Sequence, residues 1–91
     1  MDLAGLRVVK AVAETGSVSR AAESLNCVQS NVTARLKRLE EDLGVDLFRR
    51  LSRGMAPTPA GRVLADYADR VLRLVAQARD AVADAGGRGG R

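Results

Sequence analysis

The stretch that decides the fold of this 91-residue chain is residues 16–43, GSVSRAAESLNCVQSNVTARLKRLEEDL. Ser17 is a good helix N-cap, and a short helix after it collects small apolar residues on one face, namely Ala21, Ala22 and Leu25. The next three residues leave room only for a sharp change of direction: Asn26, Cys27 and Val28. A second, longer helix follows, so the stretch predicts a helix-turn-helix.

The second helix of this stretch is expected from about Gln29 to Leu43, with Gly44 as its C-terminal stop. One narrow buried stripe is predicted from the spacing of Val32, Leu36, Leu39 and Leu43. The opposite face begins with small polar groups and becomes basic: Ser30, Ala34, Lys37 and Glu41. Since three acids crowd the helix C-terminus, where they would repel phosphate, the N-terminal half is expected to meet any DNA.

The flanking sequence predicts one further helix and a small hairpin. Asp2 can cap a helix over residues 2–14, which ends at Gly16 and carries an apolar stripe of Leu3, Leu6, Val9 and Ala13. Residues 47–51 and 55–57 can form two very short strands, joined by the three-residue turn Ser52, Arg53 and Gly54. Pro57 confines its strand to an edge.

A long helix is predicted from Pro59 to Ala85, because Thr58 is an N-cap and proline is favoured at the first helical position. At about 1.5 Å per residue it would be about 40 Å long. Its apolar positions step by three and four, and they form the predicted dimer interface: Leu64, Tyr67, Val71, Leu74, Ala78 and Val82. We expect a two-fold homodimer through an antiparallel or crossing pair of these helices, with a higher oligomer left open. The alternative is that this stripe packs on its own domain.

Composition supports a mainly α fold with one small domain. Hydrophobic residues make up 46% of the chain, with one Phe, one Tyr and no Trp, so the core must consist of Leu, Val and Ala. We divide the chain into a winged helix-turn-helix domain (1–58), a linker and dimerisation helix (59–85) and a flexible Gly/Arg tail (86–91). Nine basic and seven acidic residues give residues 1–58 a net charge of +2, the linker helix is neutral, and the tail adds +2.

The same composition argues against catalysis. The chain has no His and a single Cys, so it lacks the commonest general base and any cysteine cage for a metal. We predict no enzyme activity, no cofactor, no metal and no small-molecule site. Cys27 is interpreted as a small buried hydrophobe rather than a redox sensor. Without an apolar run long enough to span a bilayer or a basic signal peptide, the chain is expected to be soluble and cytoplasmic, with no membrane partner.

Five blocks in order give the chain a specific resemblance: AAESL at 21–25, VQSNVT at 28–33, LKRLEEDLGV at 36–45, LFRR at 47–50 and TPAG at 58–61. In these blocks, residues 1 to about 85 resemble the N-terminal DNA-binding domain of the LysR-type transcriptional regulators. The resemblance implies a winged helix-turn-helix whose third helix enters the major groove of double-stranded DNA. It further implies a wing that touches the adjacent backbone or minor groove, and a linker helix that makes the dimer.

The resemblance also carries over individual residues. Gln29, Ser30 and Thr33 match positions that contact bases or phosphates in the family, and Arg53 matches the arginine at the tip of the wing. The chain departs from the family in having Val28 where Ser is usual and Ala34 where Arg is frequent. Val28 cannot cap the third helix, at a cost of about 1 kcal/mol. Ala34 can touch only a thymine methyl, so other candidates for polar readout are Asn31, Arg35 and Lys37.

Two functions of different classes follow. The first is a sequence-specific DNA-binding domain of a bacterial transcription regulator, acting as a dimer. The second is a helical protein-interaction or dimerisation module that keeps the fold without specific DNA reading, which the modest charge of residues 1–58 allows. The remaining basic side chains either contact phosphate or form an ordinary solvated surface: Lys37, Arg38, Arg49 and Arg50.

Overall fold

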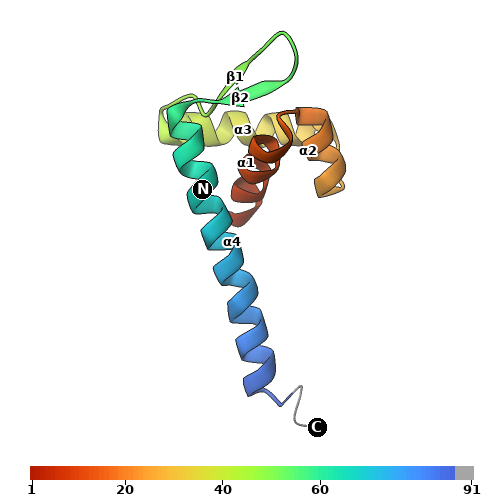
Figure 1. Ribbon diagram of the computed structural model, residues 1–91, viewed down its shortest axis with the longest axis vertical. Helices are drawn as coiled ribbons and strands as arrows, with labels where there is room; N and C mark the ends of the chain where they lie inside the picture. The colour runs from red at the N-terminus through yellow and green to blue at the C-terminus, as the bar shows by residue number, and fades with distance from the viewer. Residues whose placement is uncertain (88–91) are drawn as a thin grey trace.

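The computed structural model describes residues 1–87 and has the mainly helical architecture predicted from the sequence. In chain order the elements are α1 (Leu3–Thr15), α2 (Val18–Leu25), α3 (Gln29–Leu43), β1 (Phe48–Arg50), β2 (Met55–Pro57) and α4 (Pro59–Ala85). The first three helices and the hairpin form a body from which α4 extends to one side, giving dimensions of 54 × 25 × 18 Å (Figure 1). The last four residues of the predicted flexible tail, 88–91, lie outside the described residues.

The helices begin and end at the residues that the capping pattern indicated. The Asp2 carboxylate accepts the Gly5 N–H at 2.8 Å, and the Ser17 hydroxyl accepts the Arg20 N–H at 3.1 Å. Thr58 caps α4 in the same way. The glycines after α1 and α3 both adopt the left-handed conformation that lets the chain leave a helix. The predicted helix boundaries are therefore confirmed.

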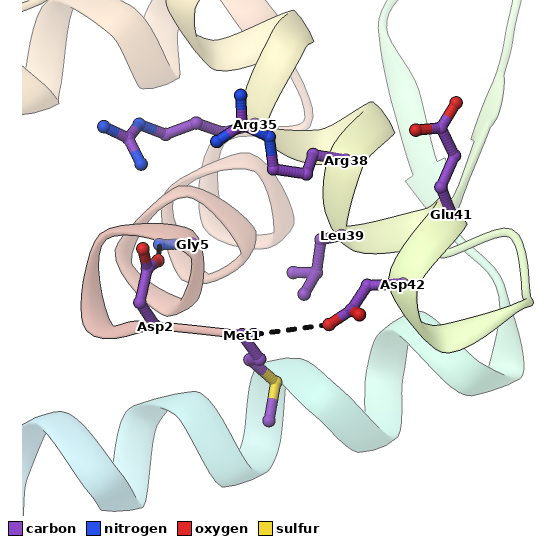
Figure 2. A pocket seen from close by; sticks show the side chains of 8 residues that line it. All are labelled: Met1, Asp2, Gly5, Arg35, Arg38, Leu39, Glu41 and Asp42. Atoms are coloured by element: carbon purple, nitrogen blue, oxygen red, sulfur yellow. Dashed lines mark hydrogen bonds and ion pairs between the residues drawn. The ribbon is translucent and has the colours of Figure 1, made fainter.

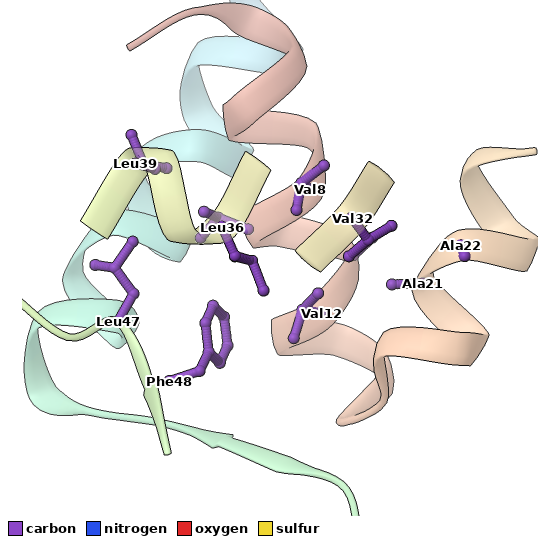
Figure 3. Close-up of a cluster of buried hydrophobic side chains, with 11 residues drawn as sticks. Val8, Val12, Ala21, Ala22, Val32, Leu36, Leu39, Leu47 and Phe48 are labelled. Atoms are coloured by element: carbon purple, nitrogen blue, oxygen red, sulfur yellow. The ribbon is translucent and has the colours of Figure 1, made fainter. Parts of the chain in front are cut away.

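The core lies between α1, α2 and α3 and is closed by Leu47 and Phe48 at the start of the hairpin (Figure 3). Its largest fully buried side chains are Val9, Val12, Val32 and Leu47. Two members of the predicted stripes do not join it: Leu43 is 42% exposed and Leu3 is 37% exposed. Leu43 is in the last turn of α3, so the buried stripe of this helix stops at Leu39.

The hairpin is a two-stranded antiparallel wing in which Phe48 faces Pro57 and Arg50 faces Met55. Its loop has four residues rather than three, because exposed Leu51 falls outside β1. The Met55 N–H donates to the carbonyl of Gly16 at 2.9 Å, which fastens the wing to the end of α1. Gly54 permits this contact, because a Cβ at that position would lie 2.3 Å from the same carbonyl oxygen.

One face of α4 packs on the body, which corrects the prediction of a single stripe for a partner. Ala68 is fully buried between α4 and α1, and a Cβ on Gly61 would lie only 1.9 Å from the Leu47 carbonyl oxygen. Leu64, predicted at the dimer interface, is half-buried against the core. Small residues thus bring the start of α4 into close contact with the body, and of the predicted stripe only Leu64 packs there.

A second face of α4 remains exposed, about a quarter-turn from the first. The larger residues on it are Val63, Tyr67, Val71, Leu74 and Val82. Leu74 and Val82 are 65% and 72% exposed and lie in the half of α4 that extends away from the body (Figure 1). Among residues 1–87, no helix combines the length and apolar character needed to cross a membrane.

Candidate nucleic-acid interface

The candidate site is the outer surface of α3, which the core holds from behind. Val32, Leu36 and Leu39 are almost fully buried and fix the rotation of the helix about its axis. All but one of the predicted contact residues on α3 are consequently turned outward. The exposed ones are Gln29, Ser30, Asn31, Thr33, Ala34 and Lys37. The exception is Arg35, which is half-buried.

The N-terminus of α3 lacks a side-chain cap. Val28 occupies the capping position, is 66% exposed and forms no side-chain hydrogen bond to the helix. The first N–H groups of α3 therefore lie at an open surface, where the positive end of the helix dipole favours an anion. The absence of a side-chain cap, predicted from the sequence, is confirmed.

One flank of α3 is joined to the wing through Glu40. Its carboxylate accepts the Leu47 N–H at 2.7 Å and the Phe48 N–H at 3.4 Å, which fixes the start of β1 against α3. Lys37 lies one turn before Glu40 on the same flank and is exposed. The wing adds three more exposed cations, of which Arg53 is in the loop between the strands: Arg49, Arg50 and Arg53.

The opposite flank of α3 faces the first turn of α1 and contains an open hollow of about 450 Å³. Figure 2 shows Arg35 and Arg38 on the same side of α3, above Asp2 and Gly5. The amino group of Met1 pairs with Asp42 at 3.3 Å across the bottom of this hollow. Each flank of the exposed α3 face thus carries cationic side chains, and the second flank also holds Asp2, Glu41 and Asp42.

The electrostatic effect of this flank is visible at Asp2. The pKa of the Asp2 carboxyl is lowered, first by the hydrogen bond from the Gly5 N–H and then by the positive charges of Arg35, the N-terminus and Arg38. Neither arginine is close enough to form an ion pair with Asp2. Asp2 is therefore held ionised as the cap of α1, while the arginines keep their own donors.

Two residues with structural roles were not predicted from the sequence, Glu40 at this site and Val63 on α4. Glu40 was interpreted only as an unfavourable acid near a helix C-terminus, because its partners come seven and eight residues later. Val63 was passed over for Leu64, although the steps from Val63 to Tyr67 and Val71 have the helical spacing of the exposed face. Within residues 1–87, the structure contains no cluster of His, Cys, Asp and Glu that could hold a metal.

Residues 3–62 match the family described as "Bacterial regulatory helix-turn-helix protein, lysR family". The chain belongs to this lysR family. It is 54% identical over 78 residues to the HTH-type transcriptional regulator YofA of Bacillus subtilis, a match that covers 86% of this chain and 27% of YofA. The lysR-family relatives matched here are named as transcriptional regulators, which agrees with the prediction that the chain is not an enzyme.

Solved structures of this lysR-family fold match nearly all of the chain or all of it. The CbnR_DBD–DNA complex has a TM-score of 0.88 with 36% identity, and the match covers 94% of this chain and 99% of that one. The BenM_DBD complex with catB site 1 DNA has a TM-score of 0.92 with 33% identity, and the match covers all of both chains. The chain spans less than a third of the length of these curated relatives.

Proposed function

We propose that this chain is the sequence-specific DNA-binding domain of a bacterial transcription regulator, acting in the cytoplasm. The observation that carries the proposal is the surface of α3, where exposed polar and small side chains occupy the first two turns above a buried apolar stripe. The similar domains of CbnR and BenM are described in complexes with DNA, which supports the same use of this surface.

In this proposal the first half of α3 enters the major groove. Gln29 can form a bidentate pair with adenine, and Ser30 and Thr33 can reach base edges or phosphates. Ala34 offers only a methyl contact with thymine, so the small residues at the centre of the face let the helix approach the bases closely. Asn31 lies at the edge of the same exposed face.

Phosphate contacts would position the domain without reading sequence. The uncapped N-terminus of α3 can accept a phosphate oxygen, because Val28 leaves its first N–H groups without a side-chain partner. Lys37 lies beside the wing and can reach the phosphates of the DNA strand on that side. Arg53, in the exposed wing loop, suits phosphate or a narrow minor groove.

We further propose that α4 forms a homodimer, so that residues 1–58 bind DNA and residues 59–85 join two copies. The exposed face of α4 borders an open apolar groove of about 550 Å³ that is lined in part by Leu6, Leu43 and Val45. An antiparallel partner helix would bring its Leu74 and Val82 toward this groove, and two-fold symmetry would repeat the contact. The two α3 helices would then meet half-sites about 34 Å or a multiple apart.

Selection from a random-sequence duplex pool tests the proposal with the chain as it exists. We expect enrichment of an inverted repeat, and tighter binding to the enriched duplex than to a scrambled duplex at moderate salt. Equal affinity for the two duplexes would overturn sequence-specific reading.

The exposed face of α4 also favours a second candidate, a dimerisation module that does not read DNA. The two functions are distinguished by variants in different places. If the module reads DNA, Ser30→Ala and Thr33→Ala will change its effect in the cell. If it only dimerises, those variants will be neutral while Val71→Glu and Leu74→Glu abolish the effect.

A further inference from the structure

The two flanks of α3 face different parts of the molecule. Lys37 and Glu40 are on the wing side, where Glu40 holds the start of β1. At about 100° per residue, Arg35 and Arg38 fall on the other side of the helix, toward the first turn of α1 (Figure 2). The exposed reading face lies between these two basic flanks.

The charges of Arg35 and Arg38 are not neutralised by ion pairs within the described part of the chain. Among residues 1–87, the ion pairs involve neither arginine. Two of the carboxylates at the same hollow have other partners, since Asp42 pairs with the Met1 amino group and Asp2 accepts the Gly5 N–H. The third, Glu41, is exposed, so the negative charges of Asp2 and Glu41 remain near the arginines, but neither carboxylate forms an ion pair with them.

The width of an α-helix compared with that of the major groove indicates that this flank would face a DNA backbone. An α-helix with its side chains is about 10–12 Å across, and the major groove is about 12 Å wide. A helix lying in the groove therefore has a sugar–phosphate backbone on each side. The wing and Lys37 supply cations toward only one of these backbones.

We propose that Arg35 and Arg38 bind the phosphates of the strand on the side of α3 away from the wing. The inference rests on the proposed DNA-binding function and adds to it a second phosphate contact surface. It also gives Arg35 a different role from the base readout expected from the sequence, because its half-buried stem directs it along the α1 flank. Together the two flanks clamp both strands and fix the orientation of the reading face.

The salt dependence of DNA binding tests this proposal. The duplex is the one that the wild-type chain selects, and the dissociation constant is measured by fluorescence anisotropy from about 50 to 200 mM salt. Each lost phosphate contact lowers the slope of log K against log salt by about 0.9. We expect Arg35→Ala with Arg38→Ala to lower the slope by about 2 and to weaken scrambled and selected duplexes by similar factors.

Matched controls distinguish the loss of a phosphate contact from a general loss of positive charge and from misfolding. Arg79→Ala removes a cation from the exposed far half of α4 and is expected to leave the slope nearly unchanged. Circular dichroism checks that the double variant folds, and the Lys versions of both residues are expected to restore most of the slope. Ethylation interference locates the phosphates that each variant contacts. We expect the double variant to lose contacts on one DNA strand and Lys37→Ala to lose them on the other.

An unchanged slope in a folded double variant would overturn the clamp and leave the proposed function standing. Loss of the same phosphates in both variants would overturn it as well. If the wild-type chain binds no duplex even at the lowest salt, both the proposed function and the clamp are wrong.

Discussion

The carboxylate of Glu40 accepts the backbone N–H of Leu47 at 2.7 Å and so connects α3 directly to the base of the wing. An acid in the last turns of a helix is unfavourable for the helix dipole. Here it supplies an acceptor to backbone donors at the start of β1 that would otherwise be partly buried without one. Glu40 therefore contributes to the placement of the wing, and so of Arg53, relative to the α3 surface, together with the bond from the Met55 N–H to the Gly16 carbonyl.

Replacing Glu40 should therefore destabilise the domain. Glu40→Ala removes a charge-assisted hydrogen bond and is expected to lower the free energy of unfolding by about 2 kcal/mol. Glu40→Gln keeps one acceptor oxygen and should cost less. Urea denaturation measures both, with exposed Glu41→Ala as the control, expected to change stability by no more than about 0.5 kcal/mol. Equal effects of the two alanine variants would contradict the structural role of Glu40.

Gly61 and Gly44 lie in different surroundings, and alanine substitutions should show the difference. At Gly61 a Cβ would overlap the Leu47 carbonyl oxygen, so Gly61→Ala must displace α4 or the wing, at a cost of about 3 kcal/mol. At Gly44 no atom lies within 4 Å of the Cβ position, and only the left-handed φ of 73° opposes alanine, at about 1 kcal/mol. Thermal and urea unfolding give both values, and a milder effect at Gly61 than at Gly44 would show that the α4 contact is looser than described.

Local signals were sufficient to predict the helix boundaries. A cap and its first-turn N–H groups lie within four residues, so Asp2, Ser17 and Thr58 could be assigned from neighbouring sequence alone. The same is true of Gly44, whose conformation is determined by the end of the helix before it. Gly44 and Thr58 also lie within the short blocks that carry the resemblance to the LysR family.

Contacts between distant segments could not be predicted in this way. The packing of Ala68 on α1 depends on small residues, which a search for large apolar side chains ignores. The exposure of Leu43 depends on which elements cover the last turn of α3, and the position of Arg35 depends on how α3 is rotated against α1. Helical periodicity gives the angle of a residue about its own axis, but not which neighbouring element covers it.

Val28 provides a prediction of increased stability. Val28→Ser places a hydroxyl where the first N–H groups of α3 have no side-chain acceptor and should raise the free energy of unfolding by about 1 kcal/mol. Val28→Ala controls for the removal of an exposed apolar side chain. If the serine variant is no more stable than the alanine variant, the N-terminus of α3 does not gain from a side-chain cap.

Base readout and phosphate contact should respond differently to mutation. Gln29→Ala and Thr33→Ala are expected to change which bases are preferred, with a cost of about 1–3 kcal/mol on the selected duplex for a lost bidentate contact. Lys37→Ala and Arg53→Ala should weaken all duplexes alike and lower the salt slope by about 1 each. Binding measured on single-base variants of the selected duplex separates the two classes. An unaltered preference profile for Gln29→Ala would remove that residue from the reading surface.

Leu74 tests the proposed dimer. Its side chain is 65% exposed on the half of α4 that extends from the body, so Leu74→Glu should scarcely affect the folding of one copy but place a charge in the helix pair. We expect sedimentation velocity to show a dimer for the wild-type chain and a monomer for the variant, together with weaker binding to an inverted repeat and little change on a single half-site. Ala76→Glu is the matched control, because Ala76 is exposed on the other side of α4 and should leave assembly intact. A variant that still sediments as a dimer, or a wild-type chain that is monomeric at every concentration, would show that α4 does not join the two copies.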